Sequence, residues 1–75
     1  MKFLITGANG DIAMSICRII KDEFKNSVVE GTDLKNEGPG EHLFNSIHKV
    51  VKPKNKNYLK QIKKISKNHK IIIPT

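Results

Sequence analysis

The segment from Thr6 to Ala13, TGANGDIA, carries residues whose types and spacing could bind a dinucleotide. Gly7 and Gly10 fit the pattern Gly-x-x-Gly-x-x-small, in which glycines let a strand turn sharply into a helix and let the backbone approach a pyrophosphate. Asp33 follows a later β-branched run, a place where an acid can bind a ribose hydroxyl. These residues raise the hypothesis of an NAD(P) site.

Asp11 opposes this hypothesis. It follows Gly10 directly, and the apolar pattern after it predicts a helix. A bound pyrophosphate would lie at the positive end of that helix, and a carboxylate in the first turn already interacts favourably with the same end. We therefore expect Gly7 and Gly10 to serve the turn and the close approach of helix to sheet, and Asp11 to stabilise the helix.

Ligands of open parallel sheets bind beyond the carboxyl ends of the strands. Asp33 and Thr75 both stand in the exits of predicted strands, so we expect both to lie at such a ligand-binding edge. The candidate residues of a substrate-side or nucleotide-side loop are therefore Gly7, Asn9, Gly10, Asp11, Asp33 and Thr75.

The elements that would position these residues alternate between strands and helices. The predicted strands span 2–5, 27–34, 47–51 and 71–75, and the predicted helices span 10–24 and 57–68, with one or two further helical turns over 41–46. Each connection must cross the sheet, which makes the strands parallel and the crossovers right-handed. We predict one α/β domain over residues 1–75, a small Rossmann-like three-layer half-fold with a four-stranded sheet in the order 3-2-1-4.

Two apolar stripes at helical spacing should hold the helices against opposite faces of this sheet. The first comprises Ile12, Ala13, Ile16, Cys17, Ile20 and Phe24, and the second comprises Tyr58, Leu59, Ile62 and Ile65. Lysines occupy the remaining surface of the second helix, which is typical of a solvated face.

The histidines offer no chemistry at the level of sequence. His42, His48 and His69 are spaced in a way that builds no metal site with the lone Cys17, and neither His48 nor His69 has a neighbouring acid in the chain. We expect solvent-facing or capping roles for them. No serine lies in a nucleophile elbow. The sequence therefore predicts no metal site and no catalytic residue.

The composition of the chain argues against several classes of function. The chain has 75 residues and a formal net charge of +7, almost wholly from lysine, with only one arginine and four aromatic residues. RNA-binding proteins usually pair basic residues with stacking aromatics, so a nucleic-acid partner is not expected. A single cysteine allows no internal disulfide, and no apolar run is long enough for a secretory signal or a membrane span. These features favour a cytoplasmic protein without membrane contact.

Longer motifs resemble one particular family. The run KFLITGANGDIAMSICRIIK, from Lys2 to Lys21, resembles the start of ATP-grasp ligases of the carbamoyl-phosphate synthetase large-subunit type, in which Gly-Asp-Ile follows the first strand. GTDL with the nearby GPG, then HKVVKP, and then NYLKQIKKISKNHKIIIPT resemble later segments of that family. The chain departs from the family's pattern in two places. It has Lys70 where the family often carries Asp, and its linker between Pro53 and Tyr58 is shortened.

The resemblance implies a pre-ATP-grasp domain, which helps to shape the acceptor-substrate side of the ligase cleft. It implies that ATP and magnesium bind to later segments of the full-length family, so this chain alone should bind no cofactor. We expect an amino-terminal module, truncated or separately encoded and inactive alone. Its partners would be the remaining ATP-grasp domains or a second copy of the chain.

Two alternatives remain. The first is the NAD(P)-binding amino-terminal part of a nucleotide-sugar epimerase or reductase, whose glycine spacing Gly7 and Gly10 satisfy. The second is a small basic interaction module that docks through the lysine-rich helix.

Overall fold

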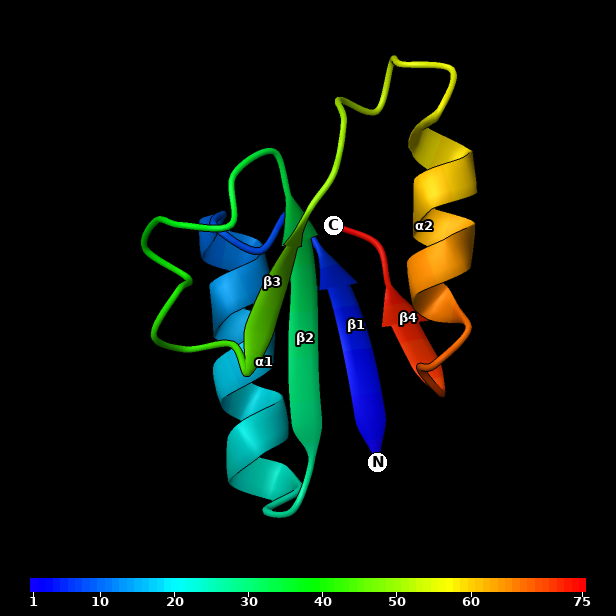
Figure 1. The fold of residues 1–75 in the computed structure, drawn as a ribbon. Helices are drawn as coiled ribbons and strands as arrows, with labels where there is room; N and C mark the ends of the chain where they lie inside the picture. The colour runs from blue at the N-terminus through cyan, green and yellow to red at the C-terminus, as the bar shows by residue number, and fades with distance from the viewer.

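The computed structural model describes residues 1–75 and contains one four-stranded parallel sheet in the order β3-β2-β1-β4. The elements are β1 (Lys2–Thr6), α1 (Asp11–Glu23), β2 (Val28–Asp33), β3 (Ser46–Lys49), α2 (Tyr58–Ser66) and β4 (Ile71–Ile73). Figure 1 shows α1 and α2 on opposite sides of the sheet, so that three layers result. The predicted α/β half-fold and its strand order are confirmed.

The sheet register places all carboxyl strand ends at one edge. β1 is central and pairs with β2 from Lys2↔Val28 to Thr6↔Thr32, and with β4 over three residues. β4 is shorter than the predicted strand over 71–75, because Pro74 has no backbone N–H with which to continue the ladder. The predicted helical turns over 41–46 are instead a tight turn that leads directly into β3.

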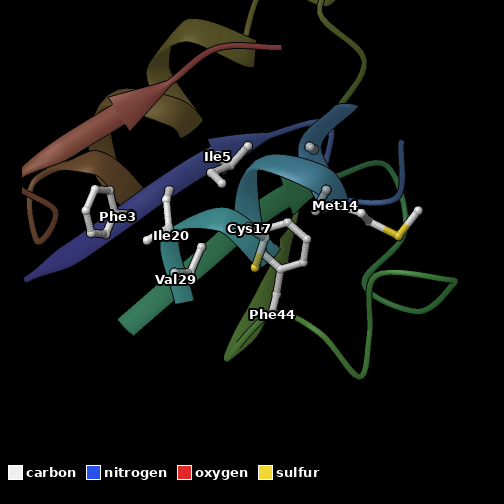
Figure 2. Packing of buried hydrophobic residues seen from close by; sticks show 9 residues of the cluster. Phe3, Ile5, Met14, Cys17, Ile20, Val29 and Phe44 are labelled. Carbon is white, nitrogen blue, oxygen red and sulfur yellow. The ribbon is translucent and has the colours of Figure 1, made fainter. Parts of the chain in front are cut away.

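One face of the sheet is apolar and is covered by α1; we call it the α1 face. Its buried cluster comprises Phe3, Ile5, Ala8, Ala13, Met14, Cys17, Ile20, Val29 and Phe44, and Figure 2 shows α1 side chains meeting those of β1 and β2. The predicted stripe on α1 is partly wrong, because Met14 is buried whereas Ile12 is 70% exposed. The helix therefore presents a slightly rotated surface to the sheet.

Gly31 lets the turn between β1 and α1 pack closely against β2 on the α1 face. A Cβ atom at this position would lie 2.5 Å from the Cβ of Ala8 and 3.1 Å from the ring of Phe44. Real Cβ atoms do not approach one another so closely, so only glycine fits here without a backbone shift.

The opposite face, which we call the α2 face, is covered less well. None of the residues of α2 is buried, and Leu59, predicted as part of its apolar stripe, is 78% exposed. Gln61 faces inward instead, and its Oε1 accepts the backbone N–H of Val51 at 2.8 Å. Leu4 is fully buried in the middle of this side of the sheet. Neither helix is both long enough and apolar enough to cross a lipid bilayer.

Candidate functional site

A cleft of about 100 Å³ opens at the carboxyl edge of the sheet. The exits of all four strands line it, and its lining includes Thr6, Gly7, Thr32, Asp33, Val50, Tyr58 and Thr75. Sites for drug-sized ligands span about 300–1,000 Å³, so this cleft holds a small group rather than a whole nucleotide.

Thr75 is fastened to the glycine turn at this cleft. Its backbone N–H donates to Thr6 Oγ1 at 2.9 Å, and its own hydroxyl donates to the Thr6 carbonyl. Gly7 has a φ of +68°, a conformation that favours glycine, and a Cβ there would lie 2.9 Å from Thr75 Oγ1. The glycine at position 7 therefore serves both the turn and the contact with Thr75.

Asn9 ties the turn to the loop that follows β2. Its side-chain Oδ1 accepts the N–H of Gly40 at 2.9 Å, and its Nδ2 donates to the carbonyls of Glu37 at 3.1 Å and Lys35 at 3.3 Å. The backbone N–H of Asn9 also donates a hydrogen bond to the carboxylate of Asp33. Four hydrogen bonds of Asn9 therefore hold β2 and the loop that follows it against the glycine turn. Asn9 therefore has a structural role at this edge.

Asp33 uses both of its carboxylate oxygens within the fold. Oδ2 accepts the backbone N–H of Asn9 at 2.8 Å, and Oδ1 accepts the N–H of Leu34 at 2.7 Å. A ribose hydroxyl would have to share an oxygen that already has a donor. Asp33 nevertheless lines the cleft and places a negative charge there.

Asp11 lies at a second, more open hollow beside the same turn. It is the first residue of α1 and is exposed, and the N-cap residue Gly10 supplies no side-chain hydrogen bond to the helix. Gly7, Gly10, Asp11 and Thr75 all border this hollow. The structure thus places Asn9, Asp33 and these four residues, the six predicted candidates, at the carboxyl edge.

A second group of polar side chains meets on the α2 face, and sequence reasoning missed it. Glu30 Oε1 lies 3.0 Å from His48 Nε2 and 2.8 Å from His69 Nε2. The side chains are 16%, 38% and 2% exposed for Glu30, His48 and His69, respectively. The chain separations are 18 and 39 residues, so the β2–β3 register and the connection from α2 to β4 bring these groups together.

Competing influences set the charge of Glu30. Burial raises its pKa, but hydrogen bonds with His48, His69 and Ser46, helped by the charge of Lys2, outweigh burial and lower the pKa to about 2. Lys2 Nζ lies 3.8 Å from the same carboxylate oxygen. Glu30 is therefore ionised at neutral pH, and its negative charge faces three nitrogen-bearing side chains.

The expected roles of the histidines need correction. His69 does contact the carboxyl end of α2, where its Nδ1 lies 3.0 Å from the Ile65 carbonyl, in line with a capping role. However, its side chain is almost fully buried, and both His69 and His48 have an acid as a spatial neighbour. His42 is exposed and belongs to no such cluster.

Cys17 is the only thiol and lies in the core beneath α1. Burial raises the pKa of the thiol, and the nearby charges of Lys21 and Arg18 only partly oppose this. A neutral, fully buried thiol is a poor nucleophile. Its place is structural, as the sequence predicts.

No family model, curated protein or solved structure matches the chain.

Proposed function

We propose that this chain is the substrate-side, amino-terminal module of an ATP-grasp ligase similar to the large subunit of carbamoyl-phosphate synthetase. The resemblance of KFLITGANGDIAMSICRIIK and of the later motifs supports the proposal. In this role the module shapes the acceptor side of a cleft, while ATP and magnesium bind to other domains of the ligase. The buried, unpaired Cys17 fits a cytoplasmic enzyme.

The observation that carries the proposal is the size and position of the carboxyl-edge cleft. Its volume of about 100 Å³ suits a small acceptor group, whereas a nucleotide would also need the adjoining hollow of about 480 Å³ beside Gly10 and Asp11. Its lining combines the hydroxyls of Thr6 and Tyr58 with the carboxylate of Asp33. Such a half-site becomes a full substrate cleft when another domain covers it, because ligand sites lie preferentially at domain interfaces.

The NAD(P) alternative is less well supported by the same edge. Thr75 packs directly over Gly7, where a pyrophosphate would approach the turn. Both oxygens of Asp33 already accept backbone N–H groups, and the carboxylate of Asp11 would face the phosphates. We therefore propose that neither NAD nor NADP is a ligand.

The experiment that tests the proposal is an NMR titration of the ¹⁵N-labelled chain. The probes are a panel of small carboxylates and amines, with NAD, NADP and ATP–magnesium measured separately. We expect at least one small probe to shift the amides of Thr6, Asp33 and Thr75, and Thr75→Val to weaken that response. Leu59→Ala, on the outer side of α2, is the matched control and should leave the response unchanged.

Two outcomes would contradict the proposal. Saturable micromolar binding of NAD or NADP with shifts at Gly7 and Gly10 would favour the epimerase or reductase alternative. A response to every probe confined to the lysines of α2 would favour the basic interaction module. We also expect no ATP hydrolysis by the chain alone, since it has no phosphate-holding loop with a magnesium-binding acid cluster.

A further inference from the structure

The cluster on the α2 face forms an arrangement that is independent of the carboxyl-edge cleft. We propose that Glu30, His48 and His69 bind one divalent transition-metal ion, with zinc as the preferred occupant.

The donor set suits this class of ion. Two imidazole nitrogens and one carboxylate oxygen lie within 4.8 Å of one another, and zinc commonly binds two histidines and one glutamate with water in the fourth position. Zinc–ligand bonds of about 2.0–2.1 Å place tetrahedral ligand atoms about 3.3 Å apart. The present distances of 2.8 and 3.0 Å from Glu30 Oε1 would open slightly, and the two histidine nitrogens, which lie within 4.8 Å of one another, would approach each other.

The hydrogen bonds of His69 give the strongest indication. Its Nδ1 lies 3.0 Å from the Ile65 carbonyl, which can only accept, so Nδ1 carries a proton. In a neutral ring, Nε2 then presents a lone pair, yet the carboxylate of Glu30 lies 2.8 Å away and also only accepts. The contact is favourable if Nε2 carries a second proton, or if a metal ion binds both atoms after they move slightly apart.

A metal ion resolves this conflict in the way that metal sites usually do. Histidine ligands typically donate their other ring N–H to a backbone carbonyl, which fixes the tautomer and the ring orientation. His69 has this arrangement with Ile65. Glu30 supplies a carboxylate oxygen as the third ligand atom of the cluster.

The cluster is open to solvent on one side, from which an ion and a water ligand would enter. His48 is 38% exposed and so opens the cluster to solvent. Lys2 is 39% exposed at its side chain and 3.8 Å from Glu30, so it can turn outward when the ion enters. The ligands stand on β2, on β3 and just before β4, so a bound ion would link three parts of the fold.

The test is calorimetric titration of zinc chloride into the untagged, chelator-stripped chain, with cobalt(II) absorption as a second readout. We expect one zinc ion per chain, a rise in Tm on zinc addition, and visible cobalt bands of the intensity typical of four-coordinate nitrogen and oxygen ligands. His48→Asn should weaken binding by about tenfold or more. His42→Asn, which changes an exposed histidine outside the cluster, is the matched control and should bind as the unaltered chain does.

Three results would overturn the proposal. They are the absence of saturable binding, binding that His48→Asn leaves unchanged, and equal losses in His48→Asn and His42→Asn. If His48→Asn fails to fold, as judged by circular dichroism, the cobalt spectrum of the unaltered chain decides. Intense four-coordinate bands support the site, and only weak six-coordinate bands contradict it.

Discussion

The two faces of the sheet differ in what holds them together. On the α1 face, alternate positions of β1 and β2 are Phe3, Ile5 and Val29, and they join a continuous apolar cluster with α1. On the α2 face, the intervening positions include Glu30 and Thr32, and no residue of α2 is buried. Because neighbouring residues of one strand point to opposite faces, the same strands provide an apolar support on one side and polar chemistry on the other.

Stability and chemistry are therefore divided between the two faces. Burial of apolar area is the main stabilising term in folding, and most of it lies under α1. The α2 face is held by directed polar contacts, such as Gln61 to Val51 and His69 to Glu30. Side chains that pack loosely can rearrange around a ligand more readily than those of a close-packed core.

The largest expected effect comes from truncating one apolar residue in each helix. Ile20→Ala removes a side chain that is 6% exposed in the α1 cluster and should lower the free energy of unfolding by about 2 to 5 kcal/mol. Leu59→Ala in α2 should change it by no more than about 0.5 kcal/mol. Urea denaturation followed by circular dichroism measures both, and similar losses for the two variants would break the comparison.

A smaller loss is expected from overfilling the α1 face. Gly31→Ala forces a methyl group against Ala8 and Phe44 and should cost about 1 to 3 kcal/mol. Ser15→Ala, at an exposed position of α1, serves as the control and should be nearly neutral. Thermal unfolding of both variants checks this, and an unchanged Tm for Gly31→Ala would mean that the turn and β2 are not closely packed.

The weakest expected effect concerns the edge strand β4. Ile71 and Ile72 are 38% and 44% exposed there, so covering each contributes less than the roughly 1.5 to 3 kcal/mol of burying a fully exposed isoleucine. We expect self-association at high concentration, strengthened by salt because screening reduces the repulsion between chains of charge +7. Ile72→Lys should shift sedimentation towards monomer. Ile19→Lys, at an exposed position of α1, should not, and a monomer under all conditions would contradict the prediction.

Local patterns in the sequence were enough to predict the parallel sheet, its order and the edge at which Gly7, Asp33 and Thr75 gather. The rotation of α1 was not predictable, because Ile12 and Met14 are equally apolar and only packing distinguishes them. The pairing of Glu30 with His48 and His69 depends on register, since Glu30 pairs with Ser46 and so places His48 diagonally across the ladder. Alternating polar residues on two strands predicted as neighbours are the one signal that could have indicated it.

Native-state hydrogen exchange tests the division between the two faces most directly. If most of the stability lies under α1, amides of β1, β2 and α1 exchange only through global unfolding. Those of α2 then exchange through local opening, with at least about tenfold less protection. Zinc should raise protection around His69, and it should raise the protection of α1 only as far as it raises the free energy of global unfolding. Equal protection of α1 and α2 in the metal-free chain would contradict the central claim.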